Sequence, residues 1–366
     1  MTLARPQFEH LVLGALDASP SRVPVLIGGC GTGRTHLLRA LREHLGPDGC
    51  QYVDVERCAS TPERMLRSVV EASAFLAPDV SIDAPSPRAA FDSTLAFLQG
   101  ARGQHDRPVT FLLDEVLEFR TFENFPGLRH VLHDLISGLP RSTNRFVLTT
   151  RYVTRALRFF REFGDAVEVI QLTPLSVDEL AAVVPASIAG DVEAVRAIHA
   201  LSDGHAGYAQ AIGQAMASLG GADPISALAS LLAPEAALTR DITYTYELRL
   251  HRARGYGALK GILDILADEE PLTLTEIAQR LQRTPGSTKD YLSWLEDVDL
   301  VTVRHKRYTF ADPLLRLWVR LHCRPEPPDD GLVAQEVQRY AFARLPLAEP
   351  ALVGVGRRGS GIIEID

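Results

Sequence analysis

The first half of the chain alternates short apolar runs with segments of helical periodicity. The apolar or alternating runs predict buried strands at 23–28, 51–56, 109–113, 146–150 and 166–172. The amphipathic stretches between them predict helices at 35–45, 62–76, 88–99, 128–136 and 153–163. Strands that alternate with helices at these spacings indicate a parallel sheet covered by helices on both faces.

Beyond Pro174 the pattern changes, and no run predicts a strand until residue 301. Glycines and prolines separate several stretches of helical periodicity, at 191–201, 207–219 and 224–232 among others. We therefore expect a small all-α domain over residues 176–254.

The segment 256–322 combines three expected helices with an expected β-hairpin. The helices are predicted at 256–268, 274–282 and 286–298, and the hairpin in VTVRHKRYTF at 301–310. Asp312-Pro313 then begins another helix, with a carboxylate N-cap and a proline in the first turn. This order is that of a winged helix, which we place at 255–323. Residues 324–366 are expected to form a linker, a short helix near 332–344 and a C-terminal tail.

Length and composition narrow the classes of protein to be considered. The 366 residues suggest two or three domains, and 46% hydrophobic with 23% charged residues is typical of a globular chain. The first residues lack the apolar run of a signal peptide, and no stretch approaches 18 apolar residues. The four cysteines form no CxxC pair. We expect a cytoplasmic protein with reduced thiols, and neither a secreted disulfide scaffold nor a membrane protein.

The segment Gly28–Thr35 reads GGCGTGRT and lies between an expected strand and an expected helix. It matches the phosphate-loop template G-x-x-x-x-G-K-[ST] everywhere except at Arg34. Glycines let backbone N–H groups and the helix N-terminus face a bound phosphate. The alternative interpretation is a glycine-rich turn that binds nothing. The candidate nucleotide-binding residues are Gly28, Gly29, Cys30, Gly31, Thr32, Gly33, Arg34, Thr35 and His36.

Arg34 stands where the template has lysine, and arginine supplies 35 of the 38 basic residues of the chain. Such a bias is typical of a GC-rich genome, but at this position the two side chains differ in geometry. Lysine is a compact point charge, whereas guanidinium is a wide planar fork that still binds phosphate. We expect ATP binding with weak or absent hydrolysis.

Two further strand ends carry candidate catalytic groups. Asp114-Glu115 follows the apolar run VTFLL, so that Asp114 and the hydroxyl of Thr35 are candidate Mg²⁺ ligands and Glu115 a candidate base for an attacking water. FVLTTR ends in Thr149-Thr150-Arg151, which can direct hydroxyls at the attacking water and a guanidinium at the γ-phosphate. The alternatives are an ordinary acidic pair and a buried strand followed by a solvated arginine.

These motifs, together with QLTPLSVDEL and SDGHAGYAQAI, resemble those of AAA+/STAND P-loop ATPases over roughly residues 8–323. The pattern is similar to the archaeal-type ATPase family with a C-terminal winged helix, which is related to origin-recognition initiators and NB-ARC switch proteins. The resemblance implies an α/β fold in which a parallel five-stranded P-loop sheet over 1–175 is followed by an all-α lid and the winged helix. It implies ATP or ADP and Mg²⁺ as ligands, with Glu115, Thr150 and Arg151 as catalytic groups.

The chain departs from the family pattern at three places. The phosphate-loop lysine is Arg34. The lid motif, usually Gly-x-Pro with the proline near the adenine, reads Gly204-His205-Ala206. The Met-His-Asp triplet of NB-ARC proteins is replaced by Phe310-Ala311-Asp312, which removes its nucleotide-contacting histidine.

The predicted winged helix has no overall basic character. Residues 241–323 contain twelve Lys and Arg and twelve Asp and Glu, and the whole chain has a net charge of −8. A DNA contact therefore requires a local basic surface. Its candidates are Lys289 on the expected recognition helix and Arg304, Lys306 and Arg307 at the hairpin tip. The alternative is a domain that packs on the lid and transmits the nucleotide state.

The sequence thus predicts an ATP-binding molecular switch whose nucleotide state controls the winged helix and its binding to DNA, to a protein partner or to further copies of the chain. Two alternatives stay open: a pseudo-ATPase that serves as a nucleotide-stabilised interaction scaffold, and a winged-helix DNA-binding regulator in which the nucleotide is only structural. Intact Thr35, Glu115 and the FVLTTR segment favour hydrolysis, whereas Arg34 favours the scaffold.

Overall fold

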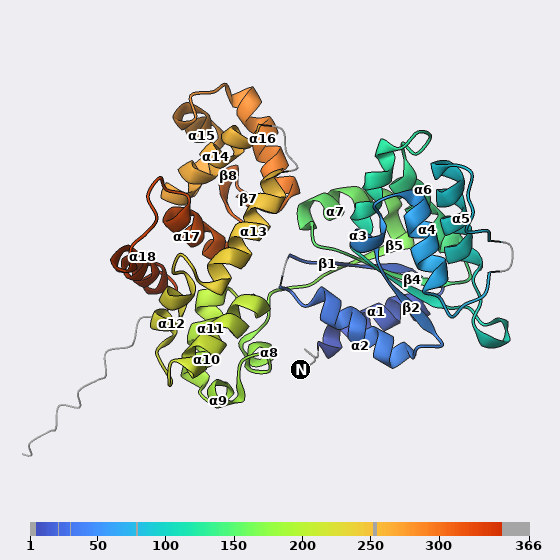
Figure 1. The fold of residues 1–366 in the computed structure, drawn as a ribbon, viewed down its shortest axis with the longest axis horizontal. Helices are drawn as coiled ribbons and strands as arrows, with labels where there is room; N and C mark the ends of the chain where they lie inside the picture. The colour runs from blue at the N-terminus through green and yellow to red at the C-terminus, as the bar shows by residue number, and fades with distance from the viewer. Residues whose placement is uncertain (1–4, 21, 30, 78–79, 252–254, 346–366) are drawn as a thin grey trace, which may run out of the picture.

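The structure is a computed structural model that describes residues 5–20, 22–29, 31–77, 80–251 and 255–345. It contains an α/β half (residues 5–172) and a mainly helical C-terminal half (residues 175–345), which Figure 1 shows side by side. The expected C-terminal tail and Cys30 of the phosphate loop lie outside the described residues.

The α/β half is built on a sheet of five strands in the order β2-β3-β4-β1-β5, and every neighbouring pair is parallel. This confirms the expected parallel five-stranded sheet. The strands are β1 (Val23–Ile27), β2 (Cys50–Asp54), β3 (Thr110–Asp114), β4 (Arg145–Thr150) and β5 (Val167–Gln171). The expected extension of the second strand to residue 56 does not form, because the carboxylate of Asp54 accepts a hydrogen bond from the Arg57 N–H and begins a helix.

Helices cover both faces of this sheet. The helices are α1 (Pro6–Asp17), α2 (Arg34–Leu45), α3 (Val55–Cys58), α4 (Pro62–Glu71), α5 (Pro87–Gly100), α6 (Val131–Gly138) and α7 (Val153–Phe160). Short 3-10 helices lie at Gln104–Asp106, Val116–Asn124, Leu139–Arg141 and Arg161–Ala166. Residues of α1 and α2 share one apolar core with Leu26 and Val147, whereas Val25 and Leu148 face a second core with α4, α5 and α6 (Figure 1). Successive strand residues therefore point to opposite faces, as strand geometry requires.

The C-terminal half begins with the helices expected between residues 176 and 254. They are α8 (Val177–Ala181), α9 (Ala186–Ala189), α10 (Val192–Ser202), α11 (Ala206–Ser218), α12 (Pro224–Leu231) and α13 (Ala237–His251). The next elements are α14 (Tyr256–Asp268), β6 (Leu272–Thr273), α15 (Leu274–Arg280), α16 (Pro285–Asp297), β7 (Val301–Arg304), β8 (Arg307–Phe310), α17 (Pro313–His322) and α18 (Asp330–Phe342). The three short strands form an antiparallel sheet in the order β6-β8-β7, and Asp312 caps α17 as expected.

A single apolar core runs through the whole C-terminal half, from Leu175 to Ala341. Helix α18 completes it, and its Tyr340 hydroxyl donates to the carbonyl of Leu201 at 2.8 Å. The segment expected to be a lid and the segment expected to be a winged helix are therefore packed as one body. The boundary between them at 254/255 stays a prediction.

Helix α7 carries one of the junctions between the two halves (Figure 1). The carboxylate of Asp299, directly after α16, accepts hydrogen bonds from the N–H groups of Val153 at 2.8 Å and Thr154 at 3.3 Å. It therefore caps the N-terminus of α7 from the other half of the molecule. Arg158 on α7 also pairs with Asp297 at 3.2 Å.

Two expectations about the environment of the chain can be compared with the structure. Among the described residues, none of the helices combines the length and apolar character needed to cross a membrane. Cys50, Cys58 and Cys323 are free thiols.

Candidate functional site

The phosphate-loop segment folds into a tight turn between β1 and α2. Gly31 and Gly33 have φ angles of +75° and +85°, which L side chains rarely adopt. A Cβ on Gly28 would lie only 2.6 Å from Oγ1 of Thr32, and that hydroxyl closes the loop by donating to the Gly29 carbonyl at 2.9 Å. The loop therefore presents backbone N–H groups and the N-terminus of a twelve-residue helix, an arrangement that binds phosphate.

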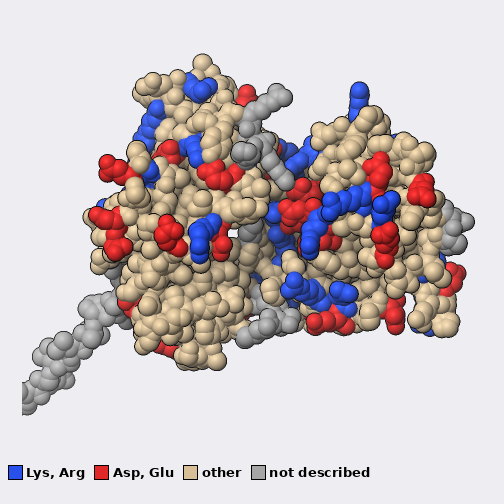
Figure 2. Space-filling view, in the orientation of Figure 1, with Lys and Arg blue, Asp and Glu red and all other residues tan. Residues whose placement is uncertain are grey.

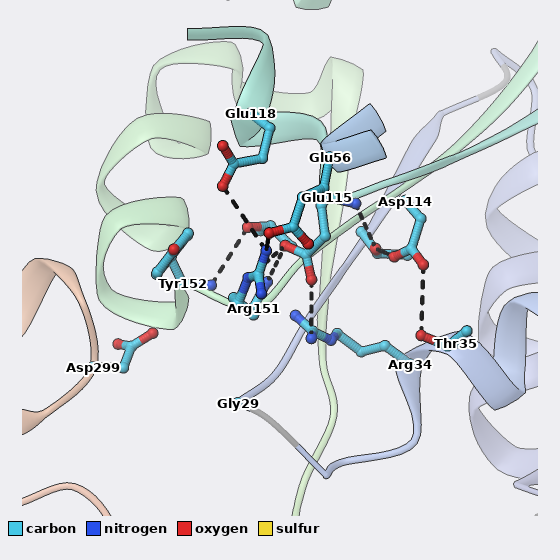
Figure 3. Close-up of polar contacts among 12 residues, drawn as sticks. Gly29, Arg34, Thr35, Glu56, Asp114, Glu115, Glu118, Arg151, Tyr152 and Asp299 are labelled. Atoms are coloured by element: carbon cyan, nitrogen blue, oxygen red, sulfur yellow. Dashed lines mark hydrogen bonds and ion pairs between the residues drawn. The ribbon is translucent and has the colours of Figure 1, made fainter. Parts of the chain in front are cut away.

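Arg34 does not extend into solvent, because its guanidinium lies against the acid that follows β3. Arg34 Nη2 lies 3.0 Å from Glu115 Oε1, and each side chain is only 10% exposed (Figure 3). Arg34 Nη1 is buried and has no hydrogen-bond partner among the described residues. One terminal nitrogen of the guanidinium, Nη2, is thus paired with Glu115, and the other, Nη1, can bind an anion.

Glu115 is held on both of its oxygens. Its Oε2 accepts a hydrogen bond from the Arg151 backbone N–H at 3.0 Å and lies 3.4 Å from Arg151 Nε. Its backbone has φ +58° and ψ +49°, a conformation that is sparsely populated for a residue with a side chain. Burial raises the pKa of Glu115, and the guanidiniums of Arg34 and Arg151 oppose this rise. The candidate base is thus fixed between two cations.

The candidate metal ligands lie next to each other at the base of the loop. Thr35 Oγ1 and Asp114 Oδ2 are 3.5 Å apart. Asp114 also accepts hydrogen bonds from the Tyr52 hydroxyl at 2.8 Å and from the Thr149 hydroxyl. Burial and the bond to Asp114 raise the pKa of Tyr52, so that its hydroxyl remains a donor.

These residues fit a nucleotide with Mg²⁺ better than they fit a metal bound by protein alone. Within the described ranges, no group of three or more His, Cys, Asp or Glu residues forms a metal cluster. Mg²⁺ is usually held by one or two protein oxygens, by water and by substrate phosphates. The hydroxyl of Thr35 and the carboxylate of Asp114 supply such a pair.

The two threonines at the end of β4 have different environments. The Thr149 hydroxyl bonds to Asp114 and also accepts from the Glu115 N–H at 3.2 Å. The Thr150 hydroxyl accepts from the Tyr152 N–H at 3.4 Å and is fully buried. Because neighbouring residues of a strand point to opposite faces, only Thr149 faces the acids. The role expected for Thr150 at the γ-phosphate stays a prediction; its hydroxyl supports the backbone after Arg151.

Arg151 lies beside Glu115, as expected, and also contacts two acids that the sequence analysis did not single out. Its Nη2 lies 2.5 Å from Glu56 Oε1 and 3.9 Å from Glu118 Oε1. Two elements, α3 and the 3-10 helix after Glu115, therefore fix its guanidinium beside Glu115 (Figure 3). His36, in contrast, lies on the first turn of α2 and, within the described residues, forms no hydrogen bond or ion pair with Asp114 or Glu115; burial and the charge of Arg39 lower its pKa.

Arg5 is a buried residue beside the phosphate loop that the sequence analysis did not single out. Its Nη1 donates to the carbonyls of Thr32 and Thr173, both at 2.9 Å, and its Nε pairs with Glu179 on α8 at 3.0 Å. The side chain is 1% exposed. It borders a cavity of about 640 Å³. The lining of that cavity includes Arg5, Thr173, Pro174, Glu179, His199 and Asp203. No local spacing points to Arg5, since Glu179 is 174 residues away.

The candidate DNA contacts are exposed on the C-terminal half. Lys289 lies near the start of α16, Arg304 is the last residue of β7, and Lys306 lies in the tight turn between β7 and β8. Within the described ranges these three side chains make no hydrogen bond or ion pair, whereas Arg307 donates to the Pro271 carbonyl at 3.1 Å. Figure 2 shows basic and acidic side chains interspersed over one face of this half. Any nucleic-acid contact is therefore a small local surface.

Comparison with known proteins identifies the fold. No family model matches the sequence, and no curated protein matches it. The Walker-type ATPase of Pyrococcus abyssi is similar in structure, with a TM-score of 0.65 and 16% identity over 87% of this chain and 96% of that chain. ORC1 of Aeropyrum pernix in complex with DNA has a TM-score of 0.42 and 17% identity over 92% and 91% of the two chains. The first likeness shows that this chain has the fold of a Walker-type ATPase, which confirms the AAA+ resemblance at the level of the fold.

Proposed function

We propose that this chain is an ATP-binding switch protein of AAA+/STAND type that hydrolyses ATP slowly. The observation that carries the proposal is the meeting of three strand ends at one place. The phosphate loop after β1, Asp114-Glu115 after β3 and Thr149 to Arg151 at the end of β4 are joined by direct hydrogen bonds and ion pairs. The groups proposed to bind phosphate, to bind Mg²⁺ and to act as the general base thus form one connected site.

Each of these residues has a role in the proposed site. The loop N–H groups and the free Nη1 of Arg34 bind the phosphates, while Thr35 and Asp114 hold Mg²⁺. Bound Mg²⁺ neutralises phosphate charge and orients the transferred group. Glu115 accepts the proton of the attacking water, and Arg151 keeps Glu115 in place through its backbone N–H.

The proposed slow turnover follows from the ion pair between Arg34 and Glu115. Both oxygens of Glu115 are engaged, Oε1 by Arg34 and Oε2 by Arg151, so that Glu115 has to release a contact before it accepts a proton. Arg34 offers the phosphates only part of its fork. Both groups have to rearrange before hydrolysis, and this rearrangement adds to the barrier.

Phosphate release by the purified chain, compared with that of Glu115→Gln, tests the proposal. We expect both proteins to bind Mg·ATP in calorimetry and the variant to lose about a hundredfold or more in turnover. Absence of Mg-nucleotide binding in both proteins removes the proposal.

The pseudo-ATPase scaffold is the second candidate function, and the same Arg34–Glu115 pair favours it. A phosphate loop whose cation is held by its own catalytic acid can bind nucleotide and leave it intact. Equal background rates of phosphate release in the wild type and in Glu115→Gln, with nucleotide still bound, identify this function.

The proposed output of the switch is the position of a lid at 176–254 and a winged helix at 255–323. Support comes from Asp299, which caps α7, the helix that begins two residues after Arg151. A change at Arg151 thereby reaches α16 through one helix.

The proposed partners are DNA, through Lys289, Arg304, Lys306 and Arg307, and a cytoplasmic protein or a second copy of the chain. A winged-helix regulator with a purely structural nucleotide is favoured only by the unpaired state of Lys289, Arg304 and Lys306.

A further inference from the structure

The guanidinium of Arg151 is surrounded by more negative charge than it carries positive charge. Its Nη2 lies 2.5 Å from Glu56 Oε1 and 3.9 Å from Glu118 Oε1, and its Nε lies 3.4 Å from Glu115 Oε2 (Figure 3). Three carboxylates therefore share one cation whose side chain is only 21% exposed. Any further anion that binds to Arg151 has to compete with a carboxylate that is already there.

The three acids are not held equally firmly. Glu115 also pairs with Arg34, and the side chains of Glu115 and Glu118 are only 10% and 12% exposed. Glu56 is 39% exposed, and within the described residues Arg151 is its only ion-pair partner. When an ion pair breaks, water can solvate an exposed carboxylate but not a buried one. Glu56 is therefore the acid nearest to the guanidinium and also the one that can leave it at the lowest cost.

The position of Glu56 follows from the way in which β2 ends. Asp54 and Asp114 are register neighbours at the ends of β2 and β3. The carboxylate of Asp54 then caps α3, and Glu56 is the second residue of this short helix. The helix thereby directs an acid from the edge strand β2 to Arg151, the residue that follows β4 (Figure 3).

Arg151 is separated from the phosphate-loop arginine by a single carboxylate. Oε1 of Glu115 lies against Arg34, and Oε2 of the same side chain lies against Arg151. In the proposed site the loop N–H groups and Arg34 bind the phosphates, so that Arg151 belongs to the next layer of side chains. ATP differs from ADP only by its terminal phosphate. A cation in this outer layer contributes to the binding of that phosphate alone.

We propose that Glu56 determines how strongly the site prefers ATP over ADP, because it competes with the terminal phosphate of ATP for the guanidinium of Arg151. The inference rests on the proposed nucleotide binding and adds a specificity-determining residue to it. A ligand binds more weakly by the fraction of molecules that are ready to accept it. Glu56 lowers the fraction in which Arg151 is free, and its charge repels the phosphate. Both effects weaken the binding of ATP and leave that of ADP unchanged.

Calorimetry on the full chain tests the proposal with two probes, Mg·ADP and the Mg²⁺ complex of β,γ-imido-ATP, which is not hydrolysed. Glu56→Gln removes the charge and keeps the size of the side chain. We expect the Kd for the imido analogue to fall about three- to tenfold in this variant, and the Kd for ADP to stay the same. Glu71→Gln, at the exposed end of α4, makes the same change in net charge and is the matched control.

A double-mutant cycle shows whether Glu56 acts through Arg151. In a chain that already carries Arg151→Gln, the added Glu56→Gln is expected to leave the ratio of the two Kd values unchanged. An equal change of this ratio with and without Arg151 would show that Glu56 acts in another way, and would overturn the proposal.

The outcomes separate this inference from the proposed function. If the wild type binds neither ADP nor the imido analogue, the proposed function fails and the inference fails with it. If the wild type binds both, but Glu56→Gln keeps the wild-type ratio of the Kd values or shifts both by the same factor, only the inference is overturned. Should Glu56→Gln not fold, Glu56→Ala replaces it, because alanine also removes the charge and favours the helix.

Discussion

Arg34 Nη2 lies 3.0 Å from Glu115 Oε1, so that the arginine of the phosphate-loop segment is paired with the candidate base. The pair is almost fully buried, where a charge without a partner is costly. Each side chain therefore stabilises the other, and the pair occupies Nη2 of Arg34 and Oε1 of Glu115.

Arg34→Lys is expected to raise the rate of ATP hydrolysis about tenfold or more. A compact ammonium supplies the point charge that fits the loop and releases Oε1 of Glu115 from the guanidinium fork. Phosphate release at saturating Mg·ATP measures the effect. Arg39→Lys, on an exposed position of α2, is the matched control. A rate for Arg34→Lys at or below that of the wild type would show that the ion pair does not limit turnover.

Asp114→Asn is expected to abolish the strengthening of ATP binding by Mg²⁺. The neutral amide lacks the charge that a hard cation requires, while the loop N–H groups remain. Calorimetric titrations of ATP with Mg²⁺ and with EDTA provide the comparison. Asp54→Asn is the control, since Asp54 is the register neighbour of Asp114 on β2 and instead caps α3. If Mg²⁺ still strengthens ATP binding by Asp114→Asn, the metal ion is held by residues other than Asp114.

Asp299 is expected to make thermal stability depend on pH between about 4 and 6. Burial raises its pKa from an ordinary value near 3.9 to about 6, although the N–H groups of Val153 and Thr154 and the charge of Arg249 oppose this rise. The folded state thus binds the proton more tightly than the unfolded state does. Asp299 therefore stabilises the folded state most below pH 4. The free energy of unfolding falls by about 1–3 kcal/mol as the pH rises from there through 6.

Asp299→Asn lacks this titration and retains an oxygen that accepts from Val153. Melting temperatures of the variant and the wild type, measured from pH 4 to pH 8, should therefore diverge in favour of the variant as the pH rises. Asp297→Asn, which removes the partner of Arg158, controls for the loss of a nearby charge. A difference between variant and wild type that stays constant over this range contradicts the assignment.

The double substitution Arg304→Ala with Lys306→Ala is expected to weaken binding to duplex DNA about tenfold at low salt. Neither side chain has a partner within the described ranges, so that both charges are available to phosphates. The slope of log K against log salt should become shallower by about 2. Arg280→Ala is the control, because Arg280 is already paired with Glu269 at 2.6 Å. Absence of salt-dependent retardation by the wild type would remove the DNA interpretation.

The sequence predicted the five strands of the α/β half and several of its helices, because these depend on local patterns, but it did not predict α1 or α3. Buried strands appear as short apolar runs, and the phosphate loop requires glycines at fixed spacing. The sequence analysis did not assign which of the two threonines at the end of β4 faces Asp114; in the structure the Thr149 hydroxyl does. Pairs such as Arg5 with Glu179 and Asp299 with Val153 join positions about 150 or more residues apart, and no periodicity records them.

The continuous apolar core from Leu175 to Ala341 has a mechanical consequence. Residues that share one close-packed interior cannot slide past each other without opening voids. Any movement of the C-terminal half against the α/β half therefore carries the segments 176–254 and 255–323 together as one body. A truncation that ends the chain at residue 254 would leave the apolar interior of the remaining helices exposed to water.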